Sequence, residues 1–202
     1  TRAQAVTFLA RALNAKADSK AEFSDVPADS YFADAVAWAA ASGVTDGVGN
    51  GLFAPGNDCT RAQIVMILYN LSGDTTDYSK YYVPFTDVRP STWYYNAVAW
   101  GYDKDIVAGM TPTTFAPDGL ITREQMAVML YRFAKAQGMD TTQGGMEVRE
   151  FDDFEQVSAY AGEAMAWAVN TGILKGADNQ LMPKAPCTRA QIVTMLHRLL
   201  AD

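Results

Sequence analysis

The sequence predicts an all-α fold built from three helix–loop–helix repeats. Three observations favour this fold: a phenylalanine-led segment recurs along the chain, an Ala-Trp pair follows it each time, and a T-R-x-Q segment then opens an apolar run with helical spacing. The chain has 202 residues, of which 49% are hydrophobic, so these repeats can bury a core of ordinary size.

The repeats align as three units, which we number along the chain. Unit 1 spans 23–71, unit 2 spans 85–135 and unit 3 spans 151–200. No pair of short helices buries its apolar stripe alone, so we expect the units to pack on one another as one all-helical domain. A further T-R-A-Q segment opens the chain, and it predicts a leading helix over 1–15 that lacks the first half of a unit.

The first helix of each unit has predicted start and stop signals. A serine that can cap the helix start precedes it, at Ser30, Ser91 and Ser158. Gly43 and Gly172 occupy the position of a C-terminal glycine, where unit 2 has Asp105. The loop that follows is rich in Gly, Asn and Pro, which predicts turns. Each loop carries a glycine at an equivalent position, namely Gly47, Gly109 and Gly176.

The T-R-x-Q segment starts the second helix of each unit. Its threonine at the N-cap and its glutamine three residues later form a capping box, which satisfies backbone N–H groups at the helix start. The pairs are Thr60/Gln63, Thr122/Gln125 and Thr188/Gln191. Capping does not explain the arginine, because a cation in the first turn faces the positive end of the helix dipole at a cost of up to ~1 kcal/mol.

Two hypotheses account for these arginines, which are Arg61, Arg123 and Arg189. In the first, each arginine pairs with a carboxylate of its own or a neighbouring unit. The candidate carboxylates are Asp25, Asp87 and Asp153. In the second, the arginine and the free amides of the helix start together bind an external anion, such as a carboxylate or a phosphate. Both hypotheses can hold in different units.

A pair of aromatic residues marks each first helix. Tyr31, Trp93 and Tyr160 each stand seven residues before a tryptophan, which is two helical turns away on the same face. The tryptophans are Trp38, Trp100 and Trp167, and we expect them in the core because their surroundings are rich in alanine. The earlier rings lie beside loops, where a partly exposed ring can stack on the apolar face of a sugar.

Charge and composition argue against several classes of protein. The net charge of −7 disfavours a general basic surface for nucleic acid. No apolar run approaches the roughly 18 residues of a membrane span. Two cysteines make no zinc site, and we expect no metal or cofactor. A disulfide would require Cys59 and Cys187 to approach closely, which the repeat disfavours, so we expect two small buried thiols.

Catalysis has little support in the sequence. The single histidine, His197, occupies the position of Tyr69 and Tyr131 in the other units, which predicts a structural role on a helix face. No nucleophile motif, zinc-protease motif or calcium loop is found, and no carboxylate pair stands out for glycoside hydrolysis. We therefore predict a binding protein and not an enzyme.

Together these motifs resemble the S-layer homology (SLH) domain family. The resemblance rests on F-x-D-V, an aromatic eight or nine residues later, a glycine-rich loop that ends in F-x-P, and T-R-x-Q before an apolar helix. The motif occurs three times, and the third copy departs from it with Phe154 for Val and Leu181 for Phe. It implies a pseudo-threefold helical bundle whose inter-unit grooves bind cell-wall polysaccharide without covalent attachment, outside the cell at the bacterial surface. In many Gram-positive bacteria that ligand is a pyruvylated secondary cell wall polymer, whose carboxylate suits an arginine at a helix start.

The residues and the resemblance lead to one predicted ligand-binding set. It comprises Arg61, Arg123, Arg189, Tyr31, Trp93, Tyr160, Gly47, Gly109, Gly176 and Lys175. The family's frequent lysine before the loop glycine is matched only by Lys175, since Asp46 and Ala108 stand elsewhere, and glutamine replaces the glutamate of the family's T-R-A-E. We therefore expect unequal grooves, of which at most two bind tightly.

Other functions stay open at this stage. A protein–protein interaction module is one alternative, and a tether between peptidoglycan and an outer-membrane protein is another. A cargo domain is expected elsewhere in the full-length protein, because modules of this family usually anchor something. The leading helix over 1–15 either closes against unit 3, remains from a fourth motif or serves as an interaction helix.

Overall fold

The computed structural model describes residues 23–45 and 47–200, and this part of the chain is helical with long loops and without strands. The predicted helix over 1–15 lies outside the described residues. The α-helices are α2 (Ala33–Ala41), α3 (Arg61–Ser72), α4 (Tyr95–Asp103), α5 (Arg123–Ala136), α6 (Gly162–Asn170) and α7 (Arg189–Leu200). Three short 3-10 helices precede α6: η1 (Glu147–Glu150), η2 (Phe154–Gln156) and η3 (Ala159–Ala161).

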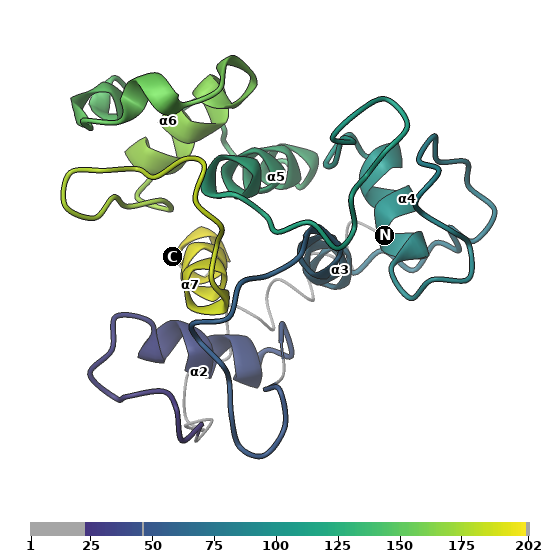
Figure 1. The fold of residues 1–202 in the computed structure, drawn as a ribbon, viewed down its shortest axis with the longest axis horizontal. Coiled ribbons are helices and arrows are strands. Elements are labelled where there is room, and N and C mark those ends of the chain that lie inside the picture. Colours follow the sequence, from purple (N-terminus) through teal and green to yellow (C-terminus); the bar gives the residue numbers. More distant parts are fainter. Residues whose placement is uncertain (1–22, 46, 201–202) are drawn as a thin grey trace.

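The six α-helices of the described residues form a pseudo-threefold bundle, as predicted (Figure 1). The second helices of the units, α3, α5 and α7, surround the centre, and the first helices, α2, α4 and α6, lie outside them (Figure 1). Each outer helix packs against the inner helix of the preceding unit, so that α4 contacts α3, α6 contacts α5 and α2 contacts α7. The contact between α2 and α7 closes the ring.

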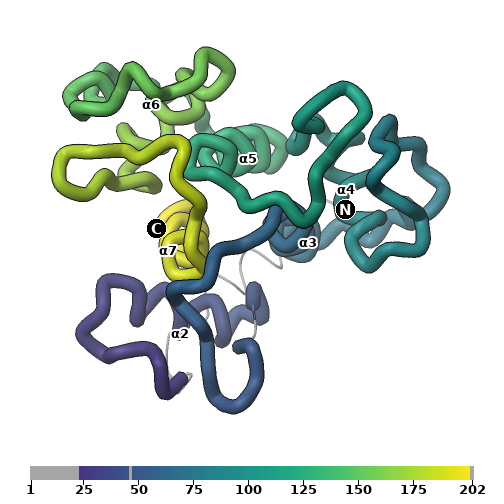
Figure 2. The backbone as a smooth tube through the Cα atoms, in the orientation of Figure 1, coloured from purple at the N-terminus to yellow at the C-terminus, as the bar shows by residue number. Residues whose placement is uncertain are grey.

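A closed set of three backbone hydrogen bonds lies where the units meet. The Cys59 N–H donates to the Cys187 carbonyl at 3.1 Å, the Cys187 N–H to the Ile121 carbonyl at 2.8 Å, and the Ile121 N–H to the Cys59 carbonyl at 3.0 Å. The segments that lead into α3, α5 and α7 form a triangle around the centre (Figure 2). All three side chains are buried, so the ring satisfies backbone groups that water does not reach.

The two cysteines therefore lie next to one another, although the repeat was expected to disfavour their approach. The positions just before the inner helices lie at the centre of the threefold arrangement, where equivalent residues meet, which is why this expectation is wrong. Both residues are free thiols and buried, as predicted.

The predicted capping boxes are confirmed in all three inner helices. In α3, the Gln63 N–H donates to Thr60 Oγ1 at 3.3 Å, and the Thr60 N–H donates back to Gln63 Oε1 at 2.9 Å. The same two bonds occur at the starts of α5 and α7. The first two N–H groups of α3 donate to carbonyls in the loop of unit 2. The Arg61 N–H donates to the Gly119 carbonyl at 2.9 Å, and the Ala62 N–H donates to the Pro117 carbonyl at 3.0 Å.

The predicted serine caps are wrong. α2, α4 and α6 start after Phe32, Tyr94 and Ala161, and none of these starts has a side-chain cap. The chain makes a turn before each of these helices. In the turn before α2, the Ser30 hydroxyl donates to the Pro27 carbonyl at 2.7 Å and does not cap the helix.

The predicted stop signals of the outer helices are confirmed. Gly43 and Gly172 adopt left-handed backbone conformations with φ of 67° and 73°. Asp105 does the same at 56°, so unit 2 keeps the turn without a glycine.

The predicted core tryptophans are buried, and each packs against the inner helix of the preceding unit. Trp38 contacts His197, Trp100 contacts Tyr69 and Trp167 contacts Tyr131, each with ring centroids 5.4 Å apart. This arrangement confirms the structural role predicted for His197.

Each loop is fixed by the aspartate two residues after the phenylalanine that opens its own unit. Asp87 accepts hydrogen bonds from the Phe115 N–H at 2.9 Å and the Ala116 N–H at 2.7 Å. Asp25 and Asp153 hold the equivalent pairs in units 1 and 3. Ala116 has a φ of 59°, a left-handed conformation that costs a residue with a Cβ roughly 1–2 kcal/mol, so the carboxylate stabilises a strained turn.

We predict that Ala116→Gly raises the free energy of unfolding by about 0.5–1 kcal/mol. Glycine removes the strain at this φ, and this gain exceeds the loss that comes from the greater entropy of the unfolded chain. Urea unfolding followed by circular dichroism measures the change. Ala37→Gly in the middle of α2 is the control and should lower stability by about 1 kcal/mol. A loss of stability in both variants would contradict the strain at Ala116.

We also predict that both thiols resist modification in the folded chain. Burial raises the pKa of the Cys59 thiol to about 11 and that of Cys187 to about 12, so little thiolate forms at pH 8. Labelling with a thiol-reactive dye should be slow in buffer. It should be fast in about 6 M guanidinium, which unfolds the chain and exposes both thiols. Equal rates in the two conditions would show that the thiols are accessible.

Candidate functional site

The T-R-x-Q arginines cross to the loop of the next unit. Arg61 donates from Nε to the Phe115 carbonyl at 2.9 Å and from Nη2 to the Ala108 carbonyl at 2.8 Å. Its guanidinium carbon lies 4.6 Å from the centre of the Phe115 ring, a cation–π contact. Arg61 is only 4% exposed, and burial lowers the pKa of its guanidinium. Arg61 therefore mainly stabilises the contact between units 1 and 2.

The other two arginines repeat this contact around the ring. Arg123 donates to the carbonyls of Leu181 at 2.6 Å and Lys175 at 3.0 Å in unit 3. Arg189 donates to the Phe53 carbonyl at 2.9 Å in unit 1, with its guanidinium 4.6 Å from that ring. Three arginines thus tie each unit to the next one, and unit 3 to unit 1.

Among the described residues, no ion pair is seen between these arginines and Asp25, Asp87 or Asp153, so the hypothesis of direct pairing is not supported. The three carboxylates bind loop amides of their own units, while the arginines bind loop carbonyls of the next unit. Phe115 shows the combined result, because its N–H donates to Asp87 and its carbonyl accepts from Arg61.

The amides at the helix starts are not available to an external anion. The first two N–H groups of α5 donate to the Ala185 and Pro183 carbonyls at 3.0 Å each, and the third donates to Thr122. α3 and α7 are satisfied in the same way. The helix-start amides therefore cannot bind an external anion together with the arginine, and this part of the hypothesis is wrong. A guanidinium has five N–H donors, of which Arg61 and Arg123 each use two on the loops, so donors remain for a ligand.

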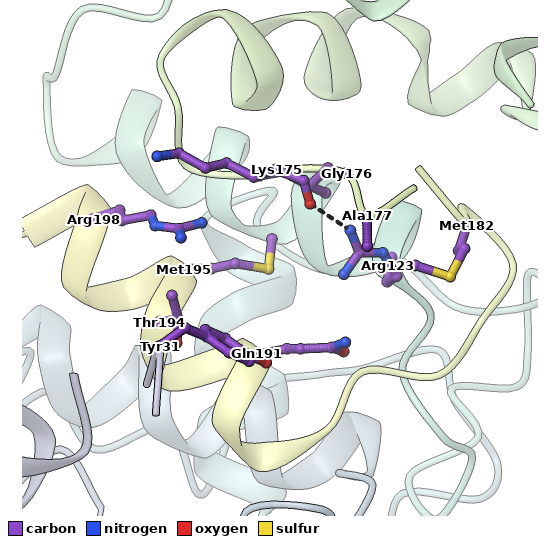
Figure 3. Close-up of a pocket in the computed structure, with 11 residues that line it drawn as sticks. Tyr31, Arg123, Lys175, Gly176, Ala177, Met182, Gln191, Thr194, Met195 and Arg198 are labelled. Atoms are coloured by element: carbon purple, nitrogen blue, oxygen red, sulfur yellow. Dashed lines mark hydrogen bonds between the residues drawn. The ribbon is translucent and has the colours of Figure 1, made fainter. Parts of the chain in front are cut away.

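A pocket of about 490 Å³ lies where all three units meet. Unit 2 contributes Arg123, unit 3 contributes its loop and one face of α7, and unit 1 contributes Tyr31. Figure 3 shows the Arg123 guanidinium on one side of this pocket, bound to the Lys175 carbonyl, and Arg198 on the other side. The predicted residues Arg123, Tyr31, Lys175 and Gly176 thus come together here.

A second pocket, of about 340 Å³, has the equivalent construction one unit earlier. Arg61 comes from unit 1, Gly109 and its loop come from unit 2 together with one face of α5, and Tyr160 comes from unit 3. The remaining predicted residues, Arg189, Trp93 and Gly47, line neither pocket.

The loop glycines have a structural role that explains their presence. A Cβ at Gly47 would lie 2.5 Å from the Leu52 carbonyl oxygen and 2.6 Å from the Phe23 ring. The same two kinds of neighbour crowd Gly109 and Gly176. Glycine is therefore required for the loop to pack on the phenylalanine that opens each unit.

Tyr160 is held over the second pocket by Glu124, a residue that the sequence analysis missed. Glu124 accepts from the Tyr160 hydroxyl at 3.0 Å, from the Ser158 N–H at 3.0 Å and from Lys184 Nζ at 2.6 Å. Burial raises the pKa of Glu124, but the bonds from Lys184, Ser158 and Tyr160 outweigh it, so the net pKa lies below its ordinary value. The signal in the sequence was T-R-E-Q in unit 2, where the other units have alanine.

The described part of the chain offers neither a metal site nor a membrane span. Among residues 23–45 and 47–200, no group of three or more His, Cys, Asp or Glu side chains is placed to hold a metal ion. None of the helices in this part is both long and apolar enough to cross a membrane.

The sequence was compared with known families and proteins. The family model of the S-layer homology domain matches residues 22–65, 84–127 and 150–193. The "Surface-layer 125 kDa protein" of Lysinibacillus sphaericus is 29% identical over 85% of this chain and 14% of its own length. The "Cellulosome-anchoring protein" of Acetivibrio thermocellus is 29% identical over 76% of this chain and 34% of its own length.

An "Endoglucanase" of Bacillus sp. (strain KSM-635) is also similar, with 32% identity over 73% of this chain and 15% of the enzyme. The chain thus spans a small part of the relatives that it matches. The family and its S-layer members indicate a cell-surface, cell-wall-associated localisation. Because the family model matches well over half of the sequence, in three tandem copies, this chain belongs to the S-layer homology domain family.

Proposed function

We propose that this chain is a non-covalent anchoring module that binds an anionic cell-wall polysaccharide in the grooves between its units. The observation that carries the proposal is the pair of inter-unit pockets, each with a guanidinium on one wall and an exposed aromatic ring on another. Their volumes, about 490 and 340 Å³, fall in the range of small-molecule sites, which suits a few sugar rings of a longer polymer.

The aromatic rings supply the contact with the sugar. Tyr31 is 67% exposed and Tyr160 is 60% exposed, although each stands at the edge of a pocket. An exposed flat ring with a polar tip suits a sugar, which has an apolar face bordered by hydroxyl groups. Glu124 fixes the Tyr160 hydroxyl, so this ring is oriented before the ligand arrives, which lowers the entropy lost on binding.

The arginines supply the preference for an anion. The remaining N–H donors of Arg61 and Arg123 face sites from which bulk water is partly excluded, and there a charge-assisted bond to a carboxylate is stronger than in water. A pyruvylated wall polymer presents such a carboxylate. Both arginines then have two roles, because the same guanidinium joins two units and contacts the ligand.

We assign no catalytic step to this chain. The endoglucanase relative is about seven times longer than the segment it shares, since that segment is 15% of the enzyme, and S-layer proteins share it as well. A shared attachment function accounts for this distribution. By the same argument, the cargo of the full-length protein resides in other domains.

We predict that Tyr31→Ala and Tyr160→Ala each weaken wall binding roughly 10-fold at the pocket that they line, because each removes a stacking ring. Cosedimentation with isolated walls of the source organism measures binding, before and after the secondary polymer is extracted. Tyr82→Ala is the matched control, since Tyr82 is 81% exposed and lines neither pocket.

Extraction of the polymer should abolish binding of the wild-type chain. Unchanged binding to extracted walls would contradict the proposal and point to peptidoglycan itself. Equal pelleting with beads that carry no wall material would show non-specific adsorption and would also contradict the proposal.

A further inference from the structure

Glu124 is a buried carboxylate of unit 2 that is held by donors of unit 3. It stands in the first turn of α5 and is 3% exposed. Its Oε2 atom accepts from the Ser158 N–H at 3.0 Å. Its Oε1 atom accepts from the Ser158 and Tyr160 hydroxyls at 3.0 Å each and from Lys184 Nζ at 2.6 Å. The carboxylate therefore joins α5 to two segments of unit 3, the one before α6 and the one before α7.

The two pockets differ at this position. The residue of α7 that corresponds to Glu124 is Ala190, so the larger pocket, where Tyr31 takes the place of Tyr160, has no such carboxylate. Among the residues that the structure describes, no hydrogen bond holds the Tyr31 hydroxyl, and the ring packs edge-on against Phe32 with centroids 5.1 Å apart. The hydroxyl at the larger pocket is thus free to turn, whereas the hydroxyl at the smaller pocket is fixed.

The Glu124 carboxylate determines where the proton of the Tyr160 hydroxyl points. Burial raises the pKa of Glu124, but the hydrogen bonds that it accepts bring the net pKa below its ordinary value, so the group is ionised at neutral pH. An ionised carboxylate can only accept hydrogen bonds. The Tyr160 proton is therefore committed to Glu124, and the oxygen can meet a ligand only as an acceptor.

The smaller pocket consequently combines donors with one acceptor. Arg61, Gln125 and Tyr160 all line it. Burial and the Glu124 charge raise the pKa of Tyr160 to about 12, whereas the Arg61 charge and the Gln125 amide lower it, which indicates that both groups lie near the Tyr160 oxygen. An anion can bind the free donors of Arg61, but it gains no proton from Tyr160. A neutral hydroxyl group of the ligand can donate to the Tyr160 oxygen instead.

We propose that Glu124 is a positioning residue that commits the Tyr160 proton, so that the smaller groove selects a sugar with a free hydroxyl group beside the anionic group bound by Arg61. The larger groove has no such requirement, because the Tyr31 hydroxyl can turn to donate or to accept. This inference rests on the proposed function and adds to it the chemistry of the ligand at one groove.

The test measures the binding of polymer released from source walls by isothermal titration, in a Tyr31→Ala background that weakens the larger pocket. Tyr160→Phe keeps the stacking ring and should weaken binding ~10-fold, as for one lost hydrogen bond. Glu124→Ala introduces the alanine of units 1 and 3 and should weaken binding roughly 3- to 10-fold. Combined with Tyr160→Phe, Glu124→Ala should cause no further loss, because no hydroxyl remains to be oriented.

Glu163→Ala is the matched control. Glu163 accepts from the Tyr131 hydroxyl at 2.6 Å, so this variant also removes a carboxylate–tyrosine bond between units 2 and 3, but neither residue lines a pocket. It should bind like the background. Glu124→Gln keeps the size of the side chain with a single acceptor oxygen, and it replaces Glu124→Ala in the cycle if circular dichroism shows that the alanine variant does not fold.

Partial methylation of the polymer's hydroxyl groups tests the ligand side of the same contact. A methyl ether has no proton to donate, so the difference between Tyr160 and Tyr160→Phe should shrink on the methylated polymer. A difference that stays at ~10-fold would overturn the hydroxyl requirement.

The inference is also overturned if Glu124→Ala weakens binding equally with and without the Tyr160 hydroxyl, or if Glu163→Ala weakens it as much. Either result would show that Glu124 acts only by joining the units. The wild-type chain would then still bind the polymer, and the proposed function would stand without the inference. A wild-type chain that binds neither walls nor polymer overturns both.

Discussion

The hydrogen bonds from one unit's arginine to the next unit's loop carbonyls are the constraint on which the rest of this structure depends. Each loop is held at the amide side by the aspartate of its own unit and at the carbonyl side by an arginine of its neighbour. A guanidinium suits this task because its fork of donors reaches two carbonyls at once, which an ammonium group does not do with the same geometry. The three backbone hydrogen bonds at the axis then close the same ring.

This construction places the candidate sites at the joints between units. Each pocket needs an arginine from one unit, a loop and helix face from the next and an aromatic ring from the third. A single unit therefore contains no complete pocket. The buried arginines lose hydration, which is costly unless their donors are satisfied, and the loop carbonyls provide most of that compensation. Under the proposed function, folding and binding use the same side chains, so variants at Arg61 or Arg123 are expected to change stability as well as the pocket.

Much of this fold was predictable because its signals are local. The capping boxes depend on residues three apart, and the left-handed turns at Gly43, Asp105 and Gly172 depend on single positions. The partner of each arginine was not predictable in this way, since Arg189 binds Phe53, which lies 136 residues earlier in the chain. The serine caps failed because a turn delays the helix starts, and the close approach of the two cysteines depends on closure of the ring. Glu124 did have a signal, because it breaks the alignment of the three units, but its meaning required the contact with Tyr160.

The central claim is that an arginine of one unit stabilises the loop of the next, and amide hydrogen exchange measured by mass spectrometry tests it most directly. Arg123→Ala alters a residue of unit 2, whose side chain binds the Leu181 and Lys175 carbonyls of unit 3. The account predicts faster exchange in the loop over 174–183, with the loop over 106–117 of unit 2 unchanged. Faster exchange confined to unit 2 would contradict the claim that the units hold one another's loops.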